Sequence, residues 1–281
     1  MRAGVALRLG RVSNLPTVTS NVLAALALAG RPVTLAHVVI LCVALSLFYV
    51  GGMWLNDAFD RDLDRVERPE RPIPSGQTDA ATVFAWGFAM LGAGVGMIAA
   101  LALGGGHVEA VLSSLGLAFV IVYYDMHHKG VPWSPLIMGL CRAGVYTTAA
   151  LSVRGDLCVE VLIGAGALVA YLIGLTYVAK QENLRELGNL WPLGFLGAAL
   201  IAAWPRGELA FAIHVALIGW VVRALWLLRA RRIKDAVVSL IAGIALLDAL
   251  WIASCGHTGV AAVAIGCFAL TTILQRVVPG T

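Results

Sequence analysis

Apolar residues recur in ten runs along this chain, and each run is close to the ~20 residues that a helix needs to cross a lipid bilayer. Unpaired backbone groups cannot face lipid, and the alternating pattern of barrel strands is absent, so we expect these runs to form helices. The sequence therefore predicts an all-α, polytopic membrane bundle of nine or ten transmembrane helices, at about residues 14–30, 33–56, 79–103, 108–124, 133–152, 158–179, 188–204, 208–228, 236–254 and 258–275.

Composition agrees with this interpretation. Of the 281 residues, 60% are hydrophobic and only 13% are charged, which is too apolar for a soluble domain of this size. No linker or low-complexity tract interrupts the runs, so we expect a single domain over residues 1–281. The net charge of +4 does not call for a nucleic-acid partner, because the basic residues lie at the edges of the predicted spans, where lipid headgroups attract them.

The basic residues are unevenly distributed between the two sets of helix ends. Fifteen of the 20 Lys and Arg residues lie at one alternate set of ends, and only three lie in the opposite loops. By the positive-inside rule, this asymmetry predicts a multi-pass protein of the inner (plasma) membrane with both termini and residues 56–71 on the cytoplasmic side.

A dense group of carboxylates follows the second apolar run, in the segment NDAFDRDLD at residues 56–64. If the helix continues through this segment, Asp57, Asp60 and Asp64 share one face, with Asn56 beside them. Crowded carboxylates repel one another unless a cation lies between them, and oxygen ligands without His or Cys suit Mg²⁺, which completes its shell with substrate phosphate. The alternative is a solvated helix end with ion pairs to the neighbouring arginines.

The motif NDxxDxxxD is followed by RPIPSG at residues 71–76. Together these two pieces resemble the signature of the UbiA superfamily of intramembrane prenyltransferases, over roughly residues 8–255. The resemblance implies a helical bundle around a cavity that opens laterally to lipid. It also implies that Mg²⁺ on two aspartate-rich motifs binds an isoprenoid diphosphate, such as geranylgeranyl diphosphate, for prenyl transfer. The expected catalytic residues are then Asn56, Asp57, Asp60, Arg61 and Asp64, of which the three aspartates hold metal.

Two further loops extend the resemblance. The segment YYDMHHKG at residues 123–130 is similar to the family's Tyr-x-x-x-Lys-Arg loop, although the position four after Tyr124 is His128 and the lysine is Lys129. The segment YVAKQENLRE at residues 177–186 departs from the family's second, DxxxD-type motif but keeps an acidic pair four residues apart. The expected substrate-binding residues are Arg11, Tyr124, His128, Lys129, Arg142, Tyr177 and Lys180, and the expected second metal-binding pair is Glu182 and Glu186.

Three residues keep more than one interpretation. Arg61 either clamps the diphosphate or neutralises its acidic neighbours. Arg142 lies within an apolar run, where a buried cation is costly, so it either binds diphosphate or pairs with a carboxylate such as Asp125 or Glu160. Asp248, inside the ninth run, either faces the cavity or bonds a neighbouring helix.

The predicted function is Mg²⁺-dependent transfer of a prenyl group from a polyprenyl diphosphate to an acceptor within the membrane. The acceptor stays open between an aromatic quinone precursor, a tetrapyrrole propionate and a sugar or cyclitol hydroxyl. One alternative is a UbiA-fold terpene cyclase. The other is a non-catalytic transporter or scaffold, which the missing DxxxD favours and the intact RPIPSG disfavours.

The acidic pair generates a direct test. Replacing Glu182 and Glu186 together by Gln keeps their shape and removes their charge, so the Mg²⁺ concentration for half-maximal activity should rise steeply. Replacing both by Asp should retain activity. If the double Gln variant turns over with an unchanged Mg²⁺ requirement, then Lys180 or Arg185 supplies positive charge on that side of the diphosphate instead.

Overall fold

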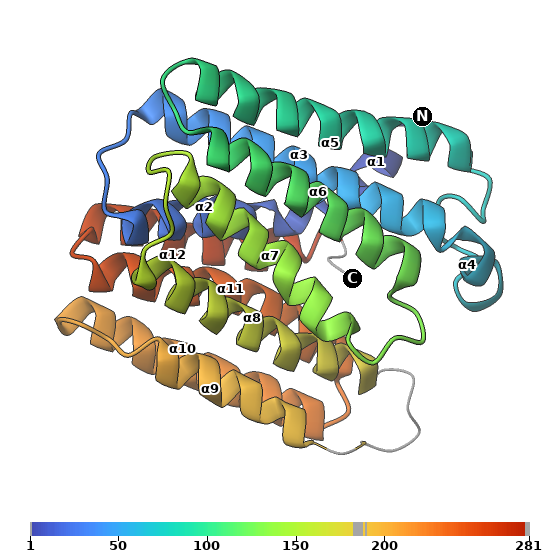
Figure 1. The fold of residues 1–281 in the computed structure, drawn as a ribbon. Coiled ribbons are helices and arrows are strands. Elements are labelled where there is room, and N and C mark those ends of the chain that lie inside the picture. Colours follow the sequence, from blue (N-terminus) through green and yellow to red (C-terminus); the bar gives the residue numbers. More distant parts are fainter. Residues whose placement is uncertain (1, 182–187, 189, 279–281) are drawn as a thin grey trace.

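The computed structural model describes residues 2–181, 188 and 190–278, and within these ranges it contains helices and no strands. Each of the ten predicted runs corresponds to one helix, which confirms the all-α fold (Figure 1). Two additional short helices, α1 and α4, were not predicted. The α-helices are α1 (Ala3–Leu9), α2 (Leu15–Ala29), α3 (Leu35–Phe59), α4 (Arg61–Glu67), α5 (Ala80–Leu103), α6 (Val108–His127), α7 (Ser134–Leu151), α8 (Val159–Lys180), α9 (Gly194–Ala202), α10 (Glu208–Arg229), α11 (Ile233–Ser254) and α12 (Thr258–Leu274).

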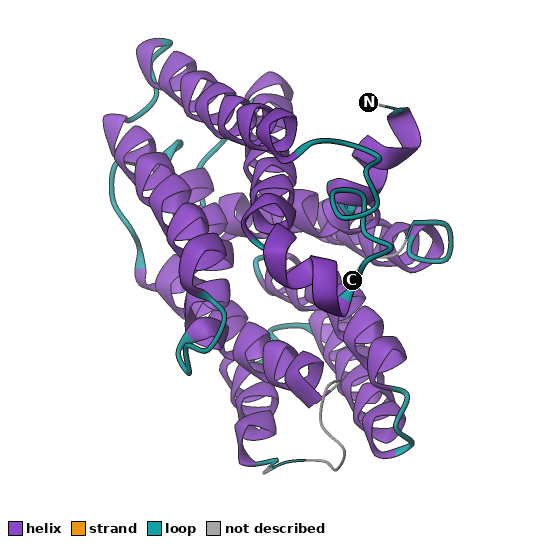
Figure 2. Cartoon of the chain, turned by 90° about the vertical axis from the view of Figure 1, so that its right-hand side faces the viewer, coloured by secondary structure: helices purple, strands orange, loops and turns teal. Residues whose placement is uncertain are grey.

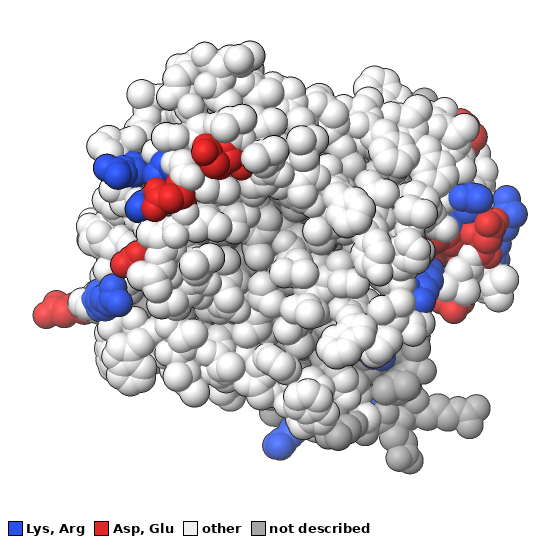
Figure 3. Space-filling view, viewed as in Figure 1, with Lys and Arg blue, Asp and Glu red and all other residues white. Residues whose placement is uncertain are grey.

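Seven helical segments are long and apolar enough to cross a membrane by length and composition, and the segments containing α9 and α12 are shorter apolar helices. The remaining predicted run, α7, has 18 residues that include Arg142. Most charged side chains on the visible face lie near two opposite ends of the bundle, with a broad uncharged band between them (Figure 3). This distribution is typical of a multi-pass membrane protein.

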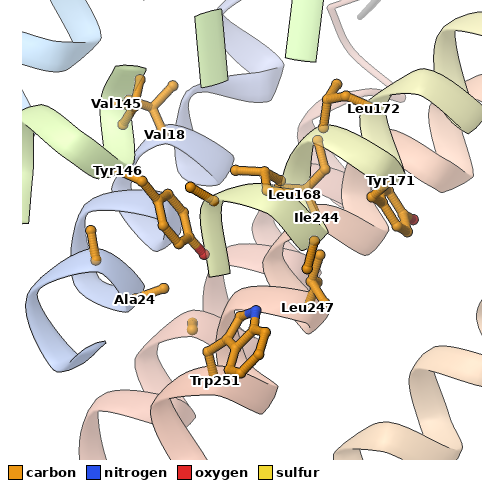
Figure 4. Close-up of a cluster of buried hydrophobic side chains, with 14 of the residues drawn as sticks. Val18, Ala24, Val145, Tyr146, Leu168, Tyr171, Leu172, Ile244, Leu247 and Trp251 are labelled. Atoms are coloured by element: carbon orange, nitrogen blue, oxygen red, sulfur yellow. The ribbon is translucent and has the colours of Figure 1, made fainter. Parts of the chain in front are cut away.

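Helix α11 is the central element of the bundle. It packs against α2, α8, α10 and α12, and nearly all of its residues are buried. The side chains of Tyr146 on α7, Leu168 on α8 and Ile244 and Trp251 on α11 contribute to one buried cluster with residues of α2 (Figure 4). Residues far apart in the sequence therefore pack together in the core of the bundle.

The N-terminal segment and the end of α12 lie at the same side of the bundle as α4, the side that faces the viewer in Figure 2. The side-chain amide of Gln275 donates to Asn14 Oδ1 at 2.9 Å, and α1 packs against α3. Leu9 and Val5 of α1 are buried in a small cluster with Trp54. This arrangement brings Arg11, just after α1, close to the acidic segment.

The helix does not continue unbroken through the acidic segment. Helix α3 ends at Phe59 and α4 begins at Arg61, with Asp60 between them at φ −81° and ψ −4°. The aspartates therefore come from three places: the last turn of α3, the junction and α4. The short helix turns away from the line of α3 (Figure 1).

Small residues allow α3 and α5 to approach closely. A Cβ atom on Gly94 of α5 would lie 2.7 Å from the ring of Phe48 and 3.0 Å from the carbonyl oxygen of Ala44, both on α3. The Phe48 ring is buried, and the Ala44 oxygen belongs to the backbone and cannot move aside. Membrane helix interfaces are commonly enriched in small residues for this reason, because lipid tails provide no hydrophobic drive for association.

We expect Gly94→Ala to destabilise the protein by about 1–3 kcal/mol, the usual cost of adding atoms to a well-packed interface. Gly92→Ala, on the same helix, is the matched control, because nothing lies within 4 Å of its added Cβ. Thermal unfolding in detergent should show a lower midpoint for the first variant only. Equal midpoints for the two variants would contradict the close α3–α5 contact.

Candidate active site

A cavity of about 840 Å³ lies inside the bundle, next to the acidic segment. Its wall is built from α2, α3, α4, α6, α7, α8 and α11 together with the loops that follow α4 and α6. Part of the wall is charged, and part is apolar, with contributions from Val18, Phe48, Val145, Leu172 and Ile244. The cavity therefore has a region suited to a polar head and another suited to a hydrocarbon chain.

The three aspartates of the motif are all buried, with exposed fractions of 7% for Asp57, 8% for Asp60 and 3% for Asp64. Asp57 Oδ1 accepts from Arg11 Nη2 and from Arg71 Nη1, each at 3.3 Å. Arg71 Nη1 also donates to Asp64 Oδ2 at 2.8 Å. Buried carboxylates require such compensation, because an unpaired charge in a low-dielectric interior is strongly unfavourable.

The RPIPSG segment is a compact turn that positions Arg71. The hydroxyl of Ser75 donates to the carbonyl oxygen of Arg71 at 2.7 Å. The backbone N–H of Gln77 donates to the carbonyl oxygen of Pro72 at 2.9 Å. Gly76 has φ +73°, a left-handed conformation that glycine adopts without steric cost. This local geometry explains how a loop residue reaches two aspartates at once.

The second loop meets the same cluster at Asp60. Lys129 Nζ lies 2.9 Å from Asp60 Oδ1, and His128 Nε2 lies 3.6 Å from Oδ2. The His128 ring stacks on Tyr124 with centroids 4.8 Å apart. Burial lowers the pKa of His128, although nearby Asp60 opposes this effect. Lys129 is the nearer of the two side chains to Asp60 and carries positive charge to it.

Asn56 connects the motif to a carboxylate of α6. Its side-chain amide donates to Asp125 Oδ1 at 3.2 Å, and Asp125 is 4% exposed. The other oxygen, Oδ2, is buried and has no hydrogen-bond partner within the described ranges. Both residues line the cavity. Asp125 therefore adds a fourth buried carboxylate beside the three of the motif.

The two intramembrane charges at Arg142 and Asp248 belong to one network. Arg142 Nη1 donates to Asn21 Oδ1 at 2.9 Å, and Asn21 Nδ2 donates to Asp248 Oδ2 at 2.8 Å. Asp248 also accepts from the hydroxyls of Ser20 and Tyr146. Of the two interpretations of Asp248, the structure favours bonding to neighbouring helices. Arg142 lines the cavity, and no ion pair to Asp125 or Glu160 is present in the described part of the chain.

The structure brings most of the predicted substrate-binding residues to one cavity. The lining residues include Arg11, Asn56, Asp60, Asp64, Tyr124, His128, Lys129, Arg142 and Lys180. Asp57 lies directly behind this wall through its contacts with Arg11 and Arg71. Tyr177 is not among the lining residues. Glu182 and Glu186 lie outside the described residues.

Arg61 does not reach the cavity. Its guanidinium donates to the carbonyl oxygen of Ala58 at 3.0 Å, pairs with Asp62 at 3.5 Å and lies 5.8 Å from the centre of the Phe84 ring. These contacts agree with the alternative in which Arg61 neutralises a neighbouring acid. Asp62 is exposed and pairs also with Arg65, so the description as a solvated helix end fits Asp62 but not the three buried aspartates.

Several cavity residues were not predicted as site residues. Arg71 was quoted only as part of RPIPSG, and Asp125 was considered only as a partner of Arg142. The sequence signal for Arg71 was its place in a motif beside the acidic segment, whereas nothing local in the sequence singles out Lys234, at the start of α11. The unpredicted polar residues of the wall include Asn14, Tyr49, Glu67, Arg68, Arg71, Asp125, Ser134, Thr176 and Lys234.

The donor chemistry around the motif fits a hard cation, because Asn56 and the aspartates offer buried oxygen atoms only. The carboxylates are not gathered into a preformed cluster, since no three His, Cys, Asp or Glu side chains among the described residues lie close enough to hold a metal ion. Basic side chains neutralise the carboxylates instead. The residues thus suit Mg²⁺ in type and burial, in competition with their basic partners.

The family model for the UbiA prenyltransferase family matches residues 16–188. A digeranylgeranylglyceryl phosphate synthase of Methanothrix thermoacetophila is 39% identical over 89 residues, which cover 32% of each chain. Another, of Thermococcus gammatolerans, is 29% identical over 178 residues, covering 59% of this chain and 60% of the relative. The chain thus spans between a third and three fifths of the length of these relatives.

Solved structures share the fold. A UbiA homologue from Archaeoglobus fulgidus bound to DMAPP and Mg²⁺ has a TM-score of 0.57 at 15% identity, covering 90% of this chain and 98% of that chain. A digeranylgeranylglyceryl phosphate synthase structure has a TM-score of 0.55 at 17% identity, covering 98% and 97%. At such low identity this likeness concerns the fold alone. The family match extends over more than half of the 281 residues and includes the acidic motif and the loops that carry Arg71 and Lys129, and the protein belongs to the UbiA prenyltransferase family.

Proposed function

We propose that this protein transfers a prenyl group from an isoprenoid diphosphate to an acceptor within the membrane. The observation that carries the proposal is the convergence of buried carboxylates with Arg11, Arg71 and Lys129 beside a cavity that also has an apolar wall. A prenyl diphosphate has the same division, since a highly charged head is joined to a hydrocarbon chain. Family membership supports this reaction class.

The basic residues would bind the diphosphate. Arg11, Arg71 and Lys129 now neutralise aspartates, and their N–H groups can equally donate to phosphate oxygens. Arginine is well suited to this role, because its planar fork matches two oxygens at once. The Arg71 guanidinium, which already contacts two aspartates, lies between the acidic motif and the loop that follows it.

Asp57, Asp60, Asp64 and Asn56 would hold Mg²⁺ at the diphosphate. When bound there, the metal ion neutralises negative charge on the departing diphosphate. The Glu182 and Glu186 pair remains the proposed second acidic arm, on sequence grounds. Arg11, Arg71 and Lys129 would contact substrate oxygens in place of the carboxylates that they neutralise in this structure.

In the proposed reaction, the bond between the allylic carbon and the diphosphate oxygen breaks, and the electron pair leaves with the diphosphate. A new bond forms between the allylic carbon and a nucleophilic atom of the acceptor, which loses a proton. Cations aimed at the departing oxygens lower this barrier, because negative charge develops there. The apolar side chains of Phe48, Leu172 and Ile244 would hold the prenyl chain and exclude water.

The names of the relatives suggest the first acceptor to test. Several are digeranylgeranylglyceryl phosphate synthases, so a prenylated glyceryl phosphate is the leading candidate. The test is to incubate purified protein with geranylgeranyl diphosphate, Mg²⁺ and geranylgeranylglyceryl phosphate, and to measure pyrophosphate and prenylated product. Pyrophosphate release with a cyclised hydrocarbon product, or no release with any acceptor, would overturn prenyl transfer.

Asp60→Asn should reduce transfer by at least about 10- to 100-fold, the loss typical even for residues one shell beyond a metal. Asp62→Asn is the matched control, because Asp62 is exposed and lies in the same segment. Asp60→Asn leaves Lys129 without its carboxylate partner, so its thermal midpoint should fall, whereas Asp62→Asn should keep the wild-type value, and turnover is therefore compared per mole of folded protein. Wild-type turnover in Asp60→Asn would return the motif to a purely structural role.

The proposed site faces the cytoplasm, as the distribution of basic residues predicts. Reporter fusions after Arg71 and Lys129 should therefore both read as cytoplasmic, and a fusion at Gly105, between α5 and α6, should read as external. A cytoplasmic result at one of the first two positions and an external result at the other would contradict a common site, because Arg71 contacts Asp57 and Asp64 while Lys129 contacts Asp60 of the same motif.

A further inference from the structure

Arg142 lies deeper in the cavity than the acidic cluster does. Its guanidinium carbon is 5.2 Å from the centre of the Tyr49 ring on α3. Tyr49 precedes Asp57 by eight residues on that helix, which corresponds to about 12 Å along the axis at 1.5 Å per residue. Tyr49 and Asp57 are therefore about two helical turns apart along α3, and Arg11 contacts Met53 between them.

The partners of Arg142 are neutral. The side chain donates to Asn21 Oδ1 at 2.9 Å and to Thr17 Oγ1 at 3.2 Å, and no carboxylate in the described part of the chain lies within ion-pair distance. A guanidinium has five N–H donors, so these two bonds leave several for a further acceptor. Charged side chains within membrane spans are costly, and they commonly face a cavity and mark a substrate pathway.

A second arginine within a predicted span, Arg223 on α10, is exposed and provides a comparison. It also donates to a hydroxyl, that of Ser239 at 2.8 Å, and lies 4.9 Å from the centre of the Trp220 ring. Arg223 does not line the cavity. The two residues therefore have similar local partners, and they differ in whether a substrate can reach them.

Asn21 connects Arg142 to the fully buried Asp248. The amide oxygen of Asn21 accepts from Arg142, and the amide nitrogen donates to the carboxylate. Asp248 has two further donors, Ser20 and Tyr146, so its own hydrogen-bonding needs are met without the arginine. The amide fixes the guanidinium in place without bringing a carboxylate against it.

We propose that Arg142 binds an oxyanion of the acceptor, so that the acceptor is an anionic amphiphile with a phosphate or carboxylate group. This inference rests on the proposed prenyl transfer and goes beyond the diphosphate binding that the sequence predicted for this residue. An unneutralised cation beside a developing allylic cation would oppose the reaction, whereas an acceptor oxyanion would cancel it. The planar guanidinium matches two oxygens of such a group. Asn21 and Asp248 are positioning residues for Arg142.

The test measures binding, so it does not depend on turnover. Wild-type protein is first titrated with the unreactive analogue geranylgeranyl thiolodiphosphate and Mg²⁺; failure to bind would count against the proposed function alone. Geranylgeranylglyceryl phosphate and geranylgeranylglycerol are then titrated, with and without the analogue. A parallel pair, 4-hydroxybenzoate and 4-hydroxybenzyl alcohol, distinguishes a carboxylate from a phosphate. The wild type should bind at least one anionic probe more tightly than its neutral counterpart.

Arg142→Gln should weaken binding of that anionic probe by about 10- to 100-fold, because hydrogen bonds to charged groups are strong. Affinity for the neutral counterpart and for the diphosphate analogue should change less than about threefold. Arg223→Gln is the matched control and should leave all affinities unchanged. Arg142→Lys keeps the charge, which protects the test against misfolding, and should lose only part of the anionic preference.

Three results would overturn the proposal. The first is a wild type that binds neither anionic probe more tightly than its neutral partner. The second is equal loss of anionic and neutral probes in Arg142→Gln. The third is a loss confined to the diphosphate analogue, which would assign Arg142 to the diphosphate.

Discussion

Charge compensation inside an apolar bundle is the constraint on which the site depends. Asp57, Asp60 and Asp64 are nearly inaccessible to solvent, and each is neutralised by a basic residue from a different part of the chain. Removing one partner of such a pair commonly costs about 3–5 kcal/mol, because an uncompensated charge remains buried. The loops that supply Arg11, Arg71 and Lys129 are therefore held against the helices by electrostatics as much as by packing.

The break between α3 and α4 follows from this constraint. In an unbroken helix the three aspartates would form one row on a single face, with their charges close together. In the structure Asp60 meets the loop after α6, while Arg71 bridges Asp57 and Asp64. Basic partners from two different loops therefore compensate the three carboxylates.

Hydropathy was sufficient to predict the ten long apolar segments, because a bilayer imposes a length and an apolar surface on each helix. It was insufficient for α1 and α4, which have seven residues each and no bilayer-sized signal. The motif at residues 56–64 identified a chemically important region, but the Arg11–Asp57 contact joins residues 46 apart and no local spacing indicates it. The same holds for Asn56 with Asp125 and for Asp248 with Ser20 and Asn21, since these pairings arise only when the helices are assembled.

Single charged residues within the predicted spans are compensated in different ways. Asp248 is satisfied by three donors, Arg223 lies against Trp220 away from the cavity, and Arg142 lies at the cavity wall with neutral partners. Of these charges only Asp248 is fully buried, Arg142 is half-buried and Arg223 is exposed, so burial does not identify the charge that meets substrate. Two criteria distinguish a structural charge from one that meets substrate. The first is whether other groups of the protein compensate the charge fully, and the second is whether a ligand in the cavity can reach it. Arg142 differs from Asp248 by the first criterion and from Arg223 by the second, and the bundle keeps Arg142 oriented through an amide at the cavity wall.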